Sequence, residues 1–306
     1  MSVLGFDTSN YTTSIAYFDG EGGLNCSQLL PVKPGELGLR QSDAVFHHTK
    51  SLPELSGRLF SHVQVDNITA VGVSTRPRAV DGSYMPCFMV GFSHAKLLSD
   101  MLAVPLVEVS HQQGHVAASL WSAGRLDLMD QPHLAWHLSG GTTELLLVEP
   151  EGKNVKCTRI GGTTDISAGQ LIDRAGVALG MQFPAGPYVE AAAKQSDSKD
   201  VFTPKINDCY FSLSGVENQF RRRIDDGMSA EDVCAFVLNT VCRTVIRASK
   251  QARKQYNLPI LVSGGVAACG MLRQQMEASL PDVWVARHGL GGDNALGCAI
   301  LAARKE

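Results

Sequence analysis

Several features that would place a protein in a special class are missing from this sequence. Its eight cysteines are scattered without a Cys-x-x-Cys pair, and neither a signal peptide nor a long apolar run is present. These absences favour a cytoplasmic protein with reduced thiols and without a membrane segment. Linkers, low-complexity stretches and disordered tails are missing too, so we expect the whole chain to fold.

An excess of charge of either sign is also missing. The net charge of -3 gives no overall attraction to nucleic acid, so RNA binding would require a local basic patch. Ser229 is predicted to cap a long helix reaching Tyr256. Four cations share one face of that helix: Arg243, Arg247, Lys250 and Lys254. This stripe is either a nucleic-acid contact or a solvated helix face.

A histidine pair stands out among the residues that are present. His111 and His115 are four residues apart, so on a helix they lie on one face and suit a divalent metal. A third ligand could come from Asp293, which follows two glycines and opens an apolar helix. Two imidazoles and one carboxylate leave coordination positions open for a substrate oxygen, which suits iron(II), zinc or manganese. The alternative is that the histidines simply line a helix.

The residue after the first histidine argues against one class of metalloenzyme. A helical zinc protease carries a glutamate directly after its first histidine, where it acts as the general base. This chain has Gln112 at that position. We therefore rank a metallopeptidase last among the functions considered.

A duplicated hairpin indicates the architecture. Residues 2–18 are two apolar strands joined by a hydroxyl-rich turn, which can hold a phosphate, while Asp7 could hold a cation or position a water. Residues 134–148 repeat the pattern around a glycine turn. With 306 residues the chain is long enough for two cores. We place the lobes at 1–132 and 133–306, with packing of the last helix back on the first lobe as an alternative. Two related α/β lobes with a nucleotide between them are typical of actin, sugar kinases and heat-shock ATPases.

The remaining elements of the first half lead to the histidines. We expect a helix from about residue 39 to 63 that is interrupted at Pro53, and a helix over 86–102. Strands are predicted over 24–30, 70–75 and 105–110. The last of these strands runs directly into the histidine helix, so both histidines lie at a strand's carboxyl end, where open α/β sheets bind ligands.

Two features of the second half suit a nucleotide. Asp173 projects from a helix of small and apolar residues and could accept hydrogen bonds from ribose hydroxyls; a plain surface aspartate is the alternative. A glycine turn, Gly264-Gly265, follows a predicted strand over 259–262 and leads into a helix. Such a turn lets the backbone approach a base or phosphate closely.

Taken in order, these motifs resemble the TsaD family, the universal threonylcarbamoyltransferases that were once catalogued as glycoproteases or M22 peptidases. The resemblance covers nearly the whole chain and rests on eight stretches: Gly5 to Ser9, the histidine pair, Ser139 to Thr142, Asp165 to Arg174, Pro184 to Pro187, Phe211 to Gly215, Gly264 to Ala268, and Asp293 to Ala295. It implies an α/β protein of the actin-like ATPase (ASKHA) fold. Such a protein has two related lobes, each a mixed sheet flanked by helices, with the ligand site in the cleft between them.

The resemblance also implies a chemistry. One divalent metal, iron or zinc before magnesium or manganese, would be held by His111, His115 and Asp293. An adenine nucleotide (threonylcarbamoyl-AMP, AMP or ATP) would contact Ser139, Gly140, Gly141, Thr142, Asp173, Gly186, Glu190, Gly264 and Gly265. Asp7 and Ser9 are the candidate catalytic residues. The reaction would transfer threonylcarbamoyl to N6 of adenosine 37 of tRNA, forming t6A. The expected partners are tRNA, a TsaB-like or TsaD-like subunit or a second copy of the chain, and no membrane.

Departures from the family pattern concentrate at the chemistry. Tyr11 and Thr12 stand where the family has an aspartate and a glutamate, so two acidic groups are gone. Other family residues are replaced as follows: a histidine by Thr142, an asparagine by Cys269, a lysine by Glu217, an acid by Gly162, and the glycines of a Gly-Pro-Gly loop by Arg76 and Arg78. These changes keep two alternatives open: a divergent paralogue with another nucleotide-dependent activity, and a non-catalytic partner of the t6A machinery.

Overall fold

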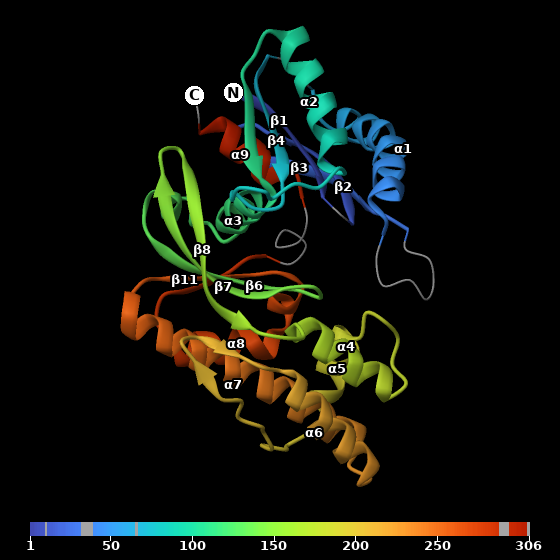
Figure 1. Cartoon of the computed structure of the whole chain (residues 1–306), viewed down its shortest axis with the longest axis vertical. Coiled ribbons are helices and arrows are strands. Elements are labelled where there is room, and N and C mark those ends of the chain that lie inside the picture. The colour runs from blue at the N-terminus through green and yellow to red at the C-terminus, as the bar shows by residue number, and fades with distance from the viewer. Residues whose placement is uncertain (10, 32–38, 65–66, 288–293, 305–306) are drawn as a thin grey trace. The chain divides into compact units, whose positions relative to one another are not determined.

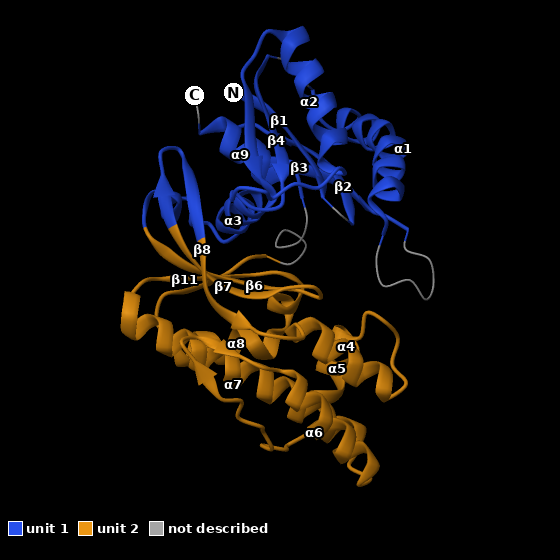
Figure 2. Ribbon diagram, viewed as in Figure 1, with its two compact units in different colours: residues 1–131, 149–157, 293–306 blue, residues 132–148, 158–292 orange. Residues whose placement is uncertain are grey.

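The chain divides into two compact units. The computed structural model describes residues 1–9, 11–31, 39–64, 67–287 and 294–304, and every structural statement below concerns these residues. Unit 1 comprises Met1–Gln131, Glu149–Cys157 and Asp293–Glu306, and unit 2 comprises Pro132–Val148 and Thr158–Gly292 (Figure 2). Within the described ranges, no helix is both long and apolar enough to cross a membrane.

Unit 1 is built on a five-stranded sheet with the order β3-β2-β1-β4-β5. The hairpin strands β1, β2 and β3 are antiparallel, whereas β4 runs parallel to β1 and β5 parallel to β4. The strands span Ser2–Ser9, Thr12–Phe18, Gly23–Leu29, Ile68–Arg76 and Leu106–Ser110. The predicted hairpin and the strands predicted over 24–30, 70–75 and 105–110 are thus all present.

Helices cover both faces of this sheet (Figure 1). Leu4 and Phe6 of β1 pack with buried side chains of α1 (Gln41–Phe60) and α2 (Phe88–Leu102). The intervening Gly5 faces the other way, toward α9 (Leu296–Ala303), and α9 in turn contacts α3 (His111–Ser122). A short 3-10 helix, η1 (Leu126–Asp130), follows α3.

Two glycines let α9 lie directly on the sheet. A Cβ at Gly5 would come within 2.2 Å of the carbonyl oxygen of Ala295, and one at Gly72 within 2.1 Å of that of Cys298. Any side chain at either position would therefore push α9 away from β1 and β4.

Unit 2 repeats this strand order and extends it. Its seven-stranded sheet has the order β12-β11-β6-β7-β8-β10-β9, so β8-β7-β6-β11-β12 reproduces the β3-β2-β1-β4-β5 order of unit 1. The strands β6 to β12 span His133–Leu138, Thr143–Glu151, Asn154–Thr163, Ile206–Asn207, Tyr210–Phe211, Ile260–Ser263 and Val283–Val285. The strand order thus repeats, as the duplicated hairpin suggested, but residues 149–157 and the last helix belong to unit 1 instead of a second lobe over 133–306.

One core joins the unit 2 sheet to its helices. These are α4 (Ala168–Ala178), α5 (Gly186–Ala193), α6 (Ser214–Asp225), α7 (Ala230–Tyr256), η2 (Gly265–Ala268) and α8 (Gly270–Ser279). The fully buried Trp136 of β6 lies in this core, and its indole N–H donates to Ser249 Oγ of α7 at 2.8 Å. Ser229 caps α7 as predicted, accepting a hydrogen bond from the amide of Asp232.

Two local expectations differ from the structure. The helix expected to break at Pro53 is continuous from Gln41 to Phe60. Proline inside a helix costs about 3 kcal/mol, but burying a leucine contributes roughly 2 kcal/mol and the α1 face buries three: Leu52, Leu55 and Leu59. Asp293, expected to cap the last helix, lies outside the described residues.

The side chain of Asn294 accepts hydrogen bonds from the amides of Leu296 and Gly297 at the start of α9.

A buried histidine makes unit 1 sensitive to acid. His48 of α1 is fully buried, with Nδ1 2.7 Å from Thr13 Oγ1 of β2. Burial lowers the pKa of His48 from 6.5 to about 4. Since the unfolded chain takes up this proton at a higher pH than the folded chain does, stability is fully present above pH 6.5 and is lost as the pH falls toward 4.

We therefore predict that His48→Gln flattens the pH dependence of stability. Between pH 7 and pH 5 the unmodified chain should lose about 2 kcal/mol more free energy of unfolding than the variant, whose amide does not titrate. Urea denaturation at both pH values measures the difference. The exposed His62, replaced by glutamine, is the control; an equal flattening by His62→Gln would contradict the assignment to His48.

Candidate functional site

A reciprocal cap fixes the start of the histidine helix. Ser110, the last residue of β5, accepts a hydrogen bond on Oγ from the amide of Gln113, and its own amide donates to Gln113 Oε1. Gln113 Nε2 also donates to the carbonyl of Val155 at 2.7 Å. The cap places His111 on the first turn of α3 and His115 directly above it.

The two imidazoles face each other through one nitrogen each. His111 Nε2 and His115 Nε2 are 2.9 Å apart. With metal–nitrogen bonds of about 2.1 Å, two nitrogens bound to one metal ion lie roughly 3 Å apart at a 90° angle and roughly 3.4 Å apart at a tetrahedral angle. The predicted pairing of the histidines is therefore present, and its geometry fits a divalent metal.

The other nitrogen of His111 is bound by a buried carboxylate. Nδ1 lies 2.9 Å from Asp7 Oδ2, and Asp7 is fully buried within β1. The second oxygen of Asp7 accepts a hydrogen bond from Ser74 Oγ of β4. A carboxylate on the distal nitrogen is the usual support of a metal-binding histidine.

The rest of the predicted metal and catalytic set is not assembled in the described part of the chain. No group of three His, Cys, Asp or Glu side chains suited to a metal occurs there, and Asp293 lies outside it. Ser9, the last residue of β1, is buried, and its hydroxyl has no hydrogen-bond partner among the described residues. Its catalytic role, like that of Asp7, stays a prediction.

In unit 2 the first and last residues of the glycine turn between β6 and β7 are hydrogen-bonded to each other. The amide of Ser139 donates to the carbonyl of Thr142 at 2.8 Å, and the amide of Thr142 donates to Ser139 Oγ at 3.0 Å. A Cβ added at Gly140 or Gly141 would meet no described atom within 4 Å. The fold thus leaves open space at both glycines.

The two glycines of the second turn differ in whether the fold has room for a side chain. Gly264 has a φ of +94°, and a Cβ there would lie 2.2 Å from the carbonyl oxygen of Leu138 at the end of β6. Gly265 has no described neighbour within 4 Å of its Cβ position. Gly264 is therefore required by the fold, whereas nothing described in the fold requires Gly265.

Helix α4 begins against the first turn and carries Asp173. Ser167 Oγ donates to the carbonyl of Gly140 at 2.6 Å, and the amide of Ala168 donates to Thr143 Oγ1 at 2.8 Å. Asp173, farther along α4, accepts a hydrogen bond from the amide of Ala185 at 2.7 Å, and burial raises the pKa of its carboxyl. One Asp173 oxygen thus ties α4 to the start of α5, and the role of this residue toward a ribose stays a prediction.

Glu190 continues this set of contacts. It lies on α5, whose first residue is Gly186, and its Oε1 accepts a hydrogen bond from the amide of Gly270 at 2.9 Å and lies 2.8 Å from Lys194 Nζ. Gly270 begins α8, just after the Gly265 turn. The predicted nucleotide residues of unit 2 therefore lie on segments linked by hydrogen bonds: the first glycine turn to α4, α4 to α5, and α5 to the start of α8.

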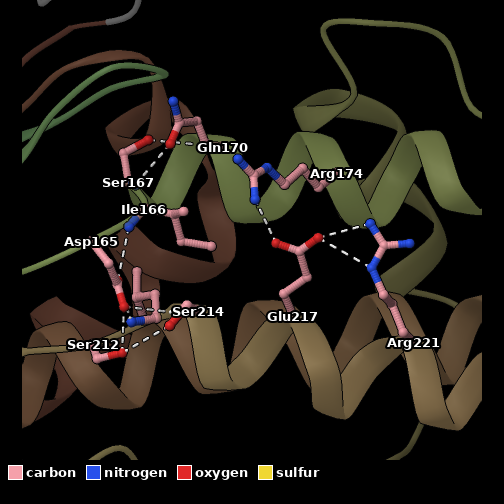
Figure 3. A network of polar contacts seen from close by, with 10 residues as sticks. Asp165, Ile166, Ser167, Gln170, Arg174, Ser212, Ser214, Glu217 and Arg221 are labelled. Atoms are coloured by element: carbon pink, nitrogen blue, oxygen red, sulfur yellow. Dashed lines mark hydrogen bonds and ion pairs between the residues drawn. The ribbon is translucent and has the colours of Figure 1, made fainter.

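Asp165 anchors a further element, a role that no local sequence pattern indicates (Figure 3). Its carboxylate accepts hydrogen bonds from the amides of Ile166, Leu213 and Ser214 and from Ser212 Oγ. Burial by itself would raise the pKa of Asp165, but the bonds from the two serines and from Leu213 outweigh it and hold the pKa well below its usual range. The loop before α4 is thereby fixed to the start of α6.

Beside this anchor, Glu217 lies between two arginines (Figure 3). Glu217 Oε2 accepts from Arg174 at 2.6 Å, and Oε1 accepts from Arg221 at 2.7 Å. Burial opposes ionisation of Glu217, but the two guanidinium groups lower its pKa. Glu217, which stands where the family has a lysine, is therefore an ionised carboxylate with an arginine at each oxygen.

Comparison with known proteins identifies relatives along most of the chain. The profile of the TsaD family, described as tRNA N6-adenosine threonylcarbamoyltransferase, matches residues 35–296. A protein of that name from Sulfurihydrogenibium sp. (strain YO3AOP1) is 32% identical over 288 residues, which cover 90% of this chain and 81% of the relative. Another from Archaeoglobus fulgidus is 28% identical over 299 residues, covering 96% of this chain and 88% of the relative.

Solved structures with little sequence identity share the fold. Full-length HypF in a phosphate- and nucleotide-bound form superposes with a TM-score of 0.66 at 14% identity, covering 99% of this chain and 46% of HypF. A ROK family glucokinase from Streptomyces griseus superposes with a TM-score of 0.54 at 13% identity, covering 99% of this chain and all of the glucokinase. The actin-like ATPase fold expected from the sequence is confirmed.

We predict that removing the Asp165 carboxylate destabilises unit 2. Asp165→Ala leaves the amides of Leu213 and Ser214 without their acceptor and should lower the free energy of unfolding by about 2 kcal/mol; Asp165→Asn, which keeps one acceptor, should cost about 1 kcal/mol. Urea denaturation followed by circular dichroism measures both. The exposed Asp225 of α6, replaced by alanine, should change stability by less than about 0.5 kcal/mol. Equal losses for Asp165→Ala and Asp225→Ala would refute the anchoring role.

Proposed function

Because this chain belongs to the TsaD family of tRNA N6-adenosine threonylcarbamoyltransferases, we propose that it transfers threonylcarbamoyl from threonylcarbamoyl-AMP to N6 of adenosine 37 of tRNA. The observation that carries the proposal is the imidazole pair of α3, with its facing nitrogens 2.9 Å apart and a buried carboxylate behind His111. Such a pair suits a metal-assisted acyl transfer.

The histidine pair has a defined part in this proposal. His111 and His115 would hold one divalent metal, with Asp293 as the third ligand. A metal at this position would supply Lewis-acid chemistry, polarising the anhydride oxygens and stabilising the charge that develops on departing AMP. Asp7 would hold His111 in orientation for that task.

The glycine turns of unit 2 have the complementary part. Gly140, Gly141 and Gly265 leave open space where a side chain would otherwise stand, so phosphate or base can approach their backbone. Glu190 holds the start of α8 beside the second turn, and Asp173, which accepts from the amide of Ala185, would also accept from a ribose hydroxyl.

On the acceptor side, positioning has to replace acid–base chemistry. An exocyclic amine is a weak nucleophile, and the first turn offers Tyr11 and Thr12 instead of two acids. Neither a phenol nor an aliphatic hydroxyl takes the place of a carboxylate as general base. Holding the amine in line with the carbonyl carbon is therefore the main contribution we assign to this turn.

A second function remains a candidate because of Glu217. Glu217, paired with Arg174 and Arg221, puts a negative charge where the family has a lysine. This change favours a divergent paralogue with another nucleotide-dependent activity, or a non-catalytic partner of the t6A machinery.

We propose that tRNA binding depends on a TsaB-like or TsaD-like subunit or a second copy of the chain, because the net charge of -3 gives no general attraction to RNA.

Complementation tests the transferase. The chain is expressed in cells depleted of their own TsaD, and t6A in their tRNA is quantified by mass spectrometry. We expect restored t6A, and we expect it to disappear with His111→Ala, which removes one proposed metal ligand. His62→Ala, a change at an exposed histidine, should leave the nucleoside at the level of the unmodified chain.

The opposite result also discriminates. If the chain is soluble and expressed together with its native partner proteins, yet t6A stays absent, the divergent function becomes the better interpretation. Restoration that survives His111→Ala would instead leave the transferase standing without the proposed metal.

Nucleotide binding can be tested at a glycine that the fold does not require. Gly141→Ala adds a methyl group that meets no described atom, so the chain should fold normally while AMP binding weakens by tenfold or more. Isothermal titration calorimetry measures the dissociation constant. Gly57→Ala is the matched control, since its Cβ also meets no described atom but lies on α1 of unit 1. Unchanged AMP affinity in Gly141→Ala would exclude this turn from the nucleotide site.

A further inference from the structure

We propose that Ser74 and Asp7 are positioning residues that hold His111 in one tautomer, with Nε2 always available as a ligand, so that only His115 changes its protonated nitrogen when a metal binds. The inference rests on the proposed function, because it concerns the same metal site. It assigns a role to Ser74 and gives Asp7 a role in place of water activation.

Strand register brings the two positioning residues together. β1 and β4 are parallel, with Gly5 beside Gly72 and Phe6 beside Val73. Side chains alternate along a strand, so Asp7 and Ser74 point to the same face as Gly5 and Gly72, the face that α9 covers. The hydroxyl of Ser74 reaches Asp7 Oδ1 there.

Helix α3 is brought to this face by a close contact with α9. A Cβ at Gly297 would lie 1.9 Å from the carbonyl oxygen of Gly114, so the two helix backbones touch. Gly114 lies between the two histidines on α3. The contact therefore places His111 Nδ1 at 2.9 Å from Asp7 Oδ2.

Asp7 determines where the proton of His111 lies. Asp7 is fully buried and a buried carboxylate is stable only when its oxygens accept hydrogen bonds. Ser74 supplies one donor, and the Nδ1–H of His111 supplies the other. A neutral imidazole with its proton on Nδ1 has its lone pair on Nε2, which points at His115.

The two histidines are consequently not equivalent. Without a metal, His115 Nε2 must donate the proton in the 2.9 Å contact, because His111 Nε2 can only accept. When both Nε2 atoms bind one metal, the His115 proton has to move to Nδ1, while His111 keeps its tautomer. The buried thiol of Cys298 does not compete as an anion, because burial and then the charge of Asp7 raise its pKa well above the ordinary value.

Imidazole tautomers and zinc affinity test the proposal in the full chain. Nitrogen-15 NMR should show His111 as the Nδ1–H tautomer with and without Zn²⁺, and His115 changing from Nε2–H to Nδ1–H on zinc addition. Competition with a chromophoric chelator should show Asp7→Asn binding zinc 10- to 100-fold more weakly, with both His111 tautomers populated. Ser74→Ala should weaken zinc binding about 3- to 10-fold, and Ser74→Thr should restore it, since the hydroxyl returns.

Ser119→Ala is the matched control. Ser119 is fully buried on the same helix, and its hydroxyl has no hydrogen-bond partner among the described residues, so its removal perturbs the core without touching Asp7. Zinc affinity and the His111 tautomer should both be unchanged. Circular dichroism of each metal-free variant establishes that it is folded.

Three results would overturn the inference. The first is a single Nδ1–H tautomer and undiminished zinc affinity in Asp7→Asn. The second is a loss of affinity in Ser119→Ala equal to that in Ser74→Ala, and the third is an unmodified chain that binds no zinc. A chain that shows both tautomer patterns and binds zinc, but makes no t6A under complementation, would refute the proposed function and leave the inference supported.

Discussion

Unit 1 depends on the close packing of α9 against the middle of its sheet. Gly5 and Gly72 remove the side chains that would separate the helix from β1 and β4, and Gly297 lets α9 touch α3 at Gly114. These three backbone contacts therefore set the distance of α3 from the sheet. That distance decides whether His111 reaches Asp7, so the geometry of the imidazole pair is determined by residues that have no functional group.

Unit 2 uses glycine for two different purposes. At Gly264 the backbone conformation and the nearby carbonyl of Leu138 leave no room for a side chain, which makes this residue part of the fold. At Gly140, Gly141 and Gly265 no described atom lies within 4 Å of the Cβ position. The absence of a side chain leaves space beside the backbone there. Capping and anchoring side chains hold the surrounding segments, including Asp165 at the start of α6 and Glu190 at the start of α8. The turns are thus kept open by rigid neighbours.

Periodicity and turn chemistry predicted much of this arrangement. The duplicated hairpins and the strand leading into the histidines are local patterns, and each is present. The continuity of α1 through Pro53 was not predictable, because it depends on leucines that become buried only in the folded unit. The bonds from Asp7 to Ser74 and His111 join residues separated by 67 and 104 positions, and no local pattern reports which distant side chains meet. The same applies to Asp165 and Leu213, which are 48 residues apart.

The order of the segments along the chain has a consequence for biosynthesis. Unit 1 contains residues 149–157 and the helix α9, and α9 follows all of unit 2 in the sequence. A ribosome therefore releases the five strands of unit 1 long before the helix that covers their glycine-bearing face. Until translation reaches α9, that face is exposed and the imidazole pair cannot be held in place. Nascent chains of this kind are prone to aggregate and benefit from chaperones, so slow late folding is built into the topology.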